Sequence, residues 1–147
     1  MDIRYFDNAA TTRIKEEVLE EMFPYLSLEY GNPSSIYGLG RRSKKAIDIA
    51  RNRVARLINC SASEITFTSC GSESDNMALK GMAFLQKFRN TGKDHLITSK
   101  IEHPAILNSC NTLEKLGFKV TYIDVDRNGF INLDNLVNSI TDKTFLI

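Results

Sequence analysis

The segment that decides the fold is residues 96–125, which read LITSKIEHPAILNSCNTLEKLGFKVTYIDV. Of its first four residues, Leu96, Ile97 and Thr98 are apolar or β-branched, and the segment predicts a strand. Pro104 then opens a stretch with helical spacing that ends at Gly117, because Pro is favoured in the first turn of a helix and Gly just past its end. Residues 118–125 are again mostly apolar or β-branched. Strand, helix and strand in this order predict a βαβ unit with parallel strands.

The same alternation continues on both sides of this unit. Residues 64–69 are rich in β-branched and aromatic residues and predict an earlier strand. A helix follows over residues 77–88 and stops near 90–92, where Asn, Thr and Gly gather. Downstream, residues 132–140 predict a short helix and residues 144–147 the start of a further strand. We therefore expect an α/β fold with a mainly parallel sheet and helices on both faces.

The first sixty residues are predicted to be mostly helical. Apolar spacing indicates a helix over residues 13–30, with a bend or break at Pro24. Residues 31–35 are dense in turn formers and predict a loop. Residues 39–58 form a basic amphipathic helix. Because Asp48 interrupts the basic residues and aromatics are absent, we interpret this face as solvated rather than as a nucleic-acid surface.

Composition narrows the class of protein. A length of 147 residues with 42% hydrophobic content is enough for one domain with a real core. The 19 basic and 18 acidic residues are mixed along the chain, which argues against nucleic acid as a partner. Three cysteines without a secretory signal predict a reduced, cytoplasmic compartment, and no apolar run approaches the roughly 20 residues that span a membrane. The apolar run at 143–147 has no polar tail after it, so we expect the sequence to be truncated there.

The junction at residues 66–76 carries the first candidate site. Gly71 permits a tight turn and Ser72, with Asp75 three residues later, resembles a capping arrangement. The segment can be a well-capped helix, or an anion cradle in which free N–H groups at a helix start bind a phosphate. The spacing of a Walker loop or a dinucleotide fingerprint is missing, so nucleotide binding by either device is disfavoured.

His103 is the second candidate. It comes just past the carboxyl end of the strand at 96–99, where ligands of open α/β sheets bind. A histidine there could stack on a planar ligand or move protons, or it could be a simple cap or surface residue. His95, at the other end of the same strand, is interpreted as structural only.

Metal binding has no support in the sequence. Residues 124–129 imitate the first half of an EF-hand loop, but position twelve is Asn135 where a bidentate Glu is needed. No pair of His or Cys residues has the spacing of metal ligands. Cys70, at the start of the predicted helix, is interpreted as a small buried residue.

Four segments occur in the order and spacing found in cysteine desulfurases, which are class V, fold-type-I pyridoxal-phosphate enzymes. They are Tyr5-Phe-Asp-Asn-Ala-Ala-Thr-Thr12, Tyr30-Gly-Asn-Pro-Ser-Ser35, Phe67-Thr-Ser-Cys-Gly-Ser-Glu-Ser-Asp-Asn76 and Glu102-His-Pro-Ala105. The chain resembles this family over essentially its whole length. The resemblance implies a three-layer, aspartate-aminotransferase-like large domain. Residues 15–147 would be its truncated first half, and residues 1–14 a strip associated with the small domain and the active site.

The resemblance also implies roles for single residues. Gly71 and Ser72 match the residues that hold the phosphate of pyridoxal 5′-phosphate (PLP), and His103 matches the imidazole that stacks on its ring and moves protons. Residues 7–12 match a strip near the substrate, and residues 31–35 a loop near the active site and the dimer interface. The implied reaction converts L-cysteine to L-alanine and leaves an enzyme persulfide. The implied protein is a homodimer that passes sulfur to an iron–sulfur scaffold or another acceptor protein, for cluster assembly or tRNA thiolation.

Several features depart from the family pattern. Cys70 stands where relatives have a smaller residue, Ser72 where Thr is commoner, and Tyr37 where many have His. The Schiff-base lysine in its Ser-x-His-Lys setting, the acid that pairs with the pyridine nitrogen and the cysteine-bearing loop are absent, so we expect this segment to be inactive alone. The alternatives are another class V enzyme, such as a selenocysteine lyase or an aminotransferase, and a non-catalytic anion-binding α/β module.

Overall fold

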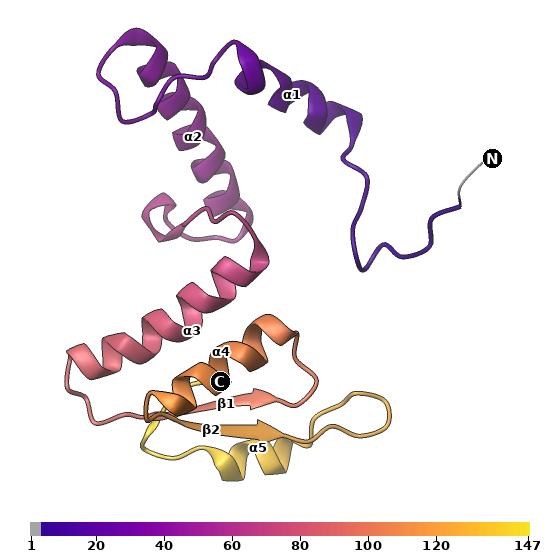
Figure 1. The fold of residues 1–147 in the computed structure, drawn as a ribbon, viewed down its shortest axis with the longest axis vertical. Helices are drawn as coiled ribbons and strands as arrows, with labels where there is room; N and C mark the ends of the chain where they lie inside the picture. The colour runs from indigo at the N-terminus through magenta and orange to yellow at the C-terminus, as the bar shows by residue number, and fades with distance from the viewer. Residues whose placement is uncertain (1–3) are drawn as a thin grey trace. The chain divides into compact units, whose positions relative to one another are not determined.

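The computed structural model describes residues 4–147. The chain forms two compact units, Met1–Thr66 and Phe67–Ile147, because most residue contacts fall within one unit or the other (Figure 1). The boundary expected after residue 14 concerns domains of a longer protein, and it stays a prediction. Among residues 4–147, no helix has both the length and the apolar character needed to cross a bilayer.

The first unit contains two helices, α1 at Glu16–Ser27 and α2 at Gly38–Leu57, and a short 3-10 turn, η1, at Ala62–Glu64. Both helices were predicted. Of the bend or break predicted at Pro24, the break is wrong, since α1 continues through Pro24 to Ser27, and the bend stays a prediction. Only three helical residues follow Pro24. Its carbonyl accepts hydrogen bonds from the N–H groups of Leu28 and Glu29, which closes the helix immediately afterwards.

The loop over residues 31–35 packs closely on the start of α2. The carbonyl of Asn32 accepts from the N–H of Ser35 at 3.0 Å, and its side chain accepts from Ser34 at 2.9 Å. A Cβ on Gly40 would lie 2.5 Å from the Asn32 carbonyl oxygen, so only glycine fits at that position. The turn residues of this loop therefore order a specific conformation against α2.

The second unit is an α/β layer structure. Helix α3 spans Gly71–Phe88, β1 His95–Ser99, α4 Pro104–Lys115, β2 Lys119–Ile123, α5 Leu133–Ser139 and β3 Thr144–Leu146. The three strands are parallel, in the order β2-β1-β3. The predicted βαβ unit is confirmed, with every predicted helix and strand from α3 onward present in the structure.

Helices α3 and α4 cover one face of the sheet and α5 lies on the other (Figure 1). A buried cluster joins α3 and α4 to the sheet, and it contains Leu79, Ala83, Leu96, Cys110, Leu113 and Phe118. Leu96 and Leu113 are fully buried, which stabilises the fold by roughly 2 kcal/mol for each side chain. The three layers confirm the predicted fold class. The buried cluster fixes α3 and α4 relative to the strands.

The strand predicted at residues 64–69 is wrong. A capping box between Ser61 and Glu64 forms the 3-10 turn that ends at Glu64. Ile65 is extended, with φ −91° and ψ 125°, but residues 64–69 form no strand of the sheet β2-β1-β3. Strand propensity expresses how well a residue fits a half-buried sheet surface, so composition alone does not place a segment in the sheet.

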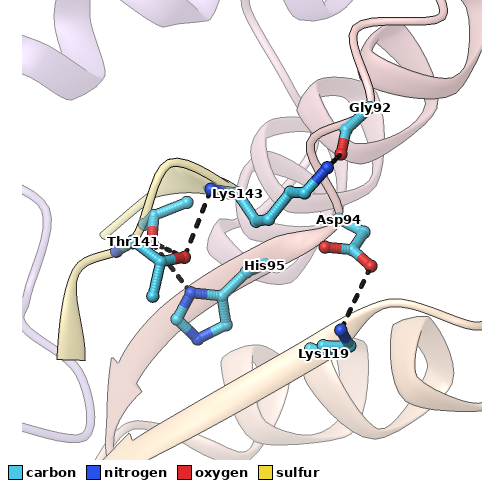
Figure 2. Close-up of polar contacts among 7 residues, drawn as sticks. Gly92, Asp94, His95, Lys119, Thr141 and Lys143 are labelled. Carbon is cyan, nitrogen blue, oxygen red and sulfur yellow. Dashed lines mark hydrogen bonds and ion pairs between the residues drawn. The ribbon is translucent and has the colours of Figure 1, made fainter.

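His95 ties the amino end of the sheet together. Its ring nitrogens lie 2.8 Å from the hydroxyl of Thr144 on β3 (Nδ1) and 2.9 Å from that of Thr121 on β2 (Nε2). Figure 2 shows the ring directed at the segment that carries Thr141 and Lys143. The side chain is 7% exposed. The geometry agrees with the structural role predicted for this residue.

Candidate functional site

The start of α3 presents unpaired backbone donors. The N-cap residue, Cys70, is extended and its side chain makes no capping hydrogen bond. The first intrahelical bond runs from the N–H of Ser74 to the Cys70 carbonyl at 3.2 Å. The N–H groups of Gly71, Ser72 and Glu73 have no acceptor within residues 4–147. Three free donors and the positive end of the helix dipole are the features of an anion-binding helix start.

Space in front of these donors is open. A Cβ placed on Gly71 would meet no atom within 4 Å. Ser72 is exposed, and only its carbonyl is engaged, by the side-chain amide of Asn76 at 2.8 Å. The hydroxyl of Ser72 therefore remains available to a ligand. A phosphate group fits both the donor set and the room at this position.

The capping pair predicted from the sequence, Ser72 with Asp75, does not form. Instead Oε2 of Glu73 accepts hydrogen bonds from the N–H of Ser69 at 2.6 Å and from its hydroxyl at 2.7 Å. These bonds, the side-chain one first, lower the pKa of Glu73. Glutamate at the third helical position is the sequence signal that could have found this contact, because that position reaches back toward the residues before the helix.

Cys70 also differs from its prediction. The structure exposes this thiol, while Cys110 is buried and Cys60 half-buried. An N-cap residue lies at the end of a helix rather than on the face that packs on the sheet, so hydrophobic character does not bury it there. All three cysteines are free thiols.

His103 is the N-cap of α4. Its Nδ1 accepts a hydrogen bond from the N–H of Ala105 at 3.1 Å, and Pro104 occupies the first helical position. In the neutral ring an accepting Nδ1 places the proton on Nε2. The side chain is exposed, so Nε2 can still face a ligand. Capping and ligand contact were alternatives in the sequence, and this geometry is compatible with both at once.

Helices α3 and α4 begin at the same end of the sheet. Nζ of Lys87, near the end of α3, donates to the carbonyl of Leu116, just past the end of α4, at 2.8 Å. The two helices therefore run in the same direction, and both start beside the carboxyl ends of β1 and β2 (Figure 1). Helix α3 has 18 residues and α4 has 12, so α3 is longer by roughly 1.7 turns, and packed helices lie ~8–10 Å apart. Gly71 and Ser72, at the start of α3, and His103, at the start of α4, therefore lie at the same end of the sheet.

One hollow of this unit is mainly apolar, although Thr98 and Ser99 are among its lining residues. It measures about 430 Å³ and is lined mainly by apolar residues, among them Ile97, Ile123, Ile131, Leu136 and Ile147. Neither Gly71, Ser72 nor His103 contributes to it. No group of three or more metal-ligating side chains gathers within residues 4–147.

An α/β unit with an open, anion-binding helix start defines a class of ligand-binding proteins. Comparison with known proteins identifies the family within that class. The family model for aminotransferase class V matches residues 4–147. The chain belongs to this family, whose members are PLP-dependent.

Individual relatives agree with this assignment. The chain is 50% identical over 143 residues to a cysteine desulfurase IscS of Clostridium botulinum (strain Kyoto) and 51% identical to one of Methanosarcina thermophila; each alignment covers 97% of this chain and 35% of the relative. A solved NifS-like protein matches with a TM-score of 0.90 at 42% identity, covering 97% of this chain and 38% of that structure. The structure described as SspA in complex with cysteine gives 0.89 at 40% identity, with 98% and 41% covered. The chain spans about a third of the length of the curated relatives.

Proposed function

We propose that this chain forms part of a PLP-dependent cysteine desulfurase. Residues 15–147 would be the first half of the cofactor-binding domain, and residues 1–14 a strip at the edge of the active site. The relatives that support this proposal are named cysteine desulfurases, and one solved relative is described in complex with cysteine. The observation that carries it is the set of three free N–H groups at the start of α3, at the same sheet end as His103.

In this proposal each residue has a limited and separate task. The N–H groups of Gly71 and Ser72, with the Ser72 hydroxyl, would hold the phosphate oxygens of PLP. His103 would lie on the ring and carry a proton at Nε2, since Nδ1 is engaged by the N–H of Ala105. When bound, PLP supplies an electron sink for the substrate amino acid.

The proposed reaction takes sulfur from L-cysteine and leaves L-alanine. The whole protein would act as a cytoplasmic homodimer and pass its sulfur to an iron–sulfur scaffold or another acceptor. A selenocysteine lyase or an aminotransferase is the alternative within the same family. The sequence holds no lysine in a Ser-x-His-Lys setting, so residues 1–147 should release no alanine by themselves.

A hybrid protein tests the proposal directly. Residues 1–147 would replace the matching segment of the Clostridium botulinum relative, to which they are 50% identical. If the proposal holds, the hybrid with PLP releases alanine and sulfide from L-cysteine, while the isolated 147-residue chain stays at the background of free PLP. A hybrid that binds PLP but releases alanine only from selenocysteine, or only transfers amino groups, contradicts the proposed substrate.

A further inference from the structure

The three free N–H groups at the start of α3 have a competitor within the same turn. Glu73 is the third helical residue, and in a capping box the carboxylate at that position reaches back to the N–H of the N-cap residue, here Cys70, which lies directly before the three free donors. Its pKa is lowered, so the side chain is a carboxylate at neutral pH. A carboxylate on the N–H groups of this turn would occupy donors and repel a phosphate dianion.

The structure holds this carboxylate elsewhere. Oε2 of Glu73 takes two hydrogen bonds, both from Ser69, at 2.6 and 2.7 Å. Ser69 lies two residues before the first helical residue, so the charge is tied back along the incoming chain rather than across the helix start. The donors of Gly71 and Ser72 stay open for a ligand.

A second contact fixes the same turn. The hydroxyls of Thr68 and Ser74 lie 2.6 Å apart, and each also contacts the carbonyl of Cys70, at 3.2 and 3.4 Å. The turn between Thr68 and Ser74 is therefore held by two tethers, one from Glu73 and one from Ser74. Donors fixed before the ligand arrives bind it more tightly, because less conformational entropy is lost on binding.

We propose that Glu73 is a positioning residue for the cofactor phosphate: its carboxylate, tied to Ser69, orders the turn and stays off the donors that bind the phosphate. This inference rests on the proposed function, in which Gly71 and Ser72 hold that phosphate. Glu73 itself touches no cofactor atom in this arrangement.

The test measures non-covalent binding of PLP and of pyridoxal, which lacks the phosphate, to the full 147-residue chain by equilibrium dialysis. Glu73→Ala should weaken PLP binding about five- to tenfold, the loss that follows from removing charge-assisted hydrogen bonds, and should leave pyridoxal binding unchanged. Glu73→Gln keeps an oxygen acceptor for the Ser69 N–H and should stay within about twofold of the native chain. Asp75→Asn is the matched control and should bind PLP like the native chain. It removes one charge near the start of α3 but leaves the hydrogen bonds between Ser69 and Glu73 intact.

A second readout separates positioning from general damage to the fold. Amide hydrogen exchange of Ser69, whose N–H donates to Glu73, should accelerate in Glu73→Ala, while exchange in β1 and α4 stays at the native rate. Ser69→Ala, which removes only the hydroxyl bond, should have a smaller effect. The double variant should be no weaker than Glu73→Ala, since the tether is already lost there.

Two different failures can be told apart. If Glu73→Ala binds PLP as tightly as the native chain, or more tightly, Glu73 is not a positioning residue and the inference is overturned. If the native chain itself binds PLP no better than pyridoxal, the helix start is not a phosphate site and the proposed function fails first.

Discussion

Nδ1 of His103 accepts a hydrogen bond from the N–H of Ala105 at 3.1 Å, so the residue proposed to face the cofactor also caps α4. These two tasks use different ring nitrogens. They can therefore be separated by substitution, because asparagine is a good N-cap but has no imidazole.

His103→Ala should lower the free energy of unfolding by about 1 kcal/mol, the usual cost of losing an N-cap. His103→Asn should keep the cap and remain close to the native stability. In the hybrid enzyme both variants should lose most of the alanine release, since neither can carry the proton at Nε2. Urea unfolding and the alanine assay, run on the same pair, check this. Full activity of His103→Asn would show that the residue is only a cap.

Ser72 should contribute to phosphate binding without contributing to stability. It is exposed and its hydroxyl makes no hydrogen bond within residues 4–147. Ser72→Ala should weaken PLP binding about tenfold or more and leave pyridoxal binding unchanged, because a hydrogen bond to a charged group contributes about 1.5–3 kcal/mol. Ser72→Thr keeps the hydroxyl and serves as the control. Equal losses for PLP and pyridoxal would place the phosphate elsewhere.

Local signals predicted most of the second unit. Pro104 and Gly117 mark the ends of α4, and the periodicity of the strands and helices between 71 and 147 needs no knowledge of distant contacts. The segment at 64–69 has the composition of a strand but forms none within residues 4–147. Composition cannot reveal this, because pairing depends on which edges of a sheet are open.

The candidate site was predicted in part. Gly71 and Ser72 follow from a glycine at the entry to a helix, and His103 from its place after a strand. The tether between Ser69 and Glu73 was missed, since several side chains near a helix start can reach back and rotamers decide which one does. The partners of His95 were beyond prediction, because they lie 26 and 49 residues further along the chain.

The His95 contacts predict a stability effect that is independent of the cofactor. Thr121→Val removes the hydroxyl beside Nε2 while keeping the shape of the side chain. A polar nitrogen on a buried ring is then left without its partner, which should lower the free energy of unfolding by about 1–3 kcal/mol. Thr112→Val is the matched control, because that hydroxyl bonds only within α4, on an exposed surface. PLP binding should not change in either variant, as His95 lies at the amino end of β1. A loss of PLP affinity in Thr121→Val would contradict this separation.

Ionisation of Tyr122 makes the stability of the folded chain depend on pH in the alkaline range. Burial first, and then the hydrogen bond that its hydroxyl donates to Glu114 at 3.0 Å, raise the pKa of Tyr122 from an ordinary value of 10.0 to about 12. Between these two pH values the folded chain binds more protons than the unfolded chain, so stability must fall as pH rises through this window. Below pH 10 the full contribution is present.

Urea unfolding at several pH values between 9 and 12 measures this slope for Tyr122, with phenolate absorbance following the ionisation itself. Tyr122→Phe should remove the latest tyrosine ionisation and flatten the loss of stability in that window. Glu114→Gln removes the neighbouring negative charge but not the burial, so the pKa of Tyr122 should move part of the way back toward its ordinary value. An unchanged pH slope in Tyr122→Phe would mean that another group accounts for the alkaline loss of stability.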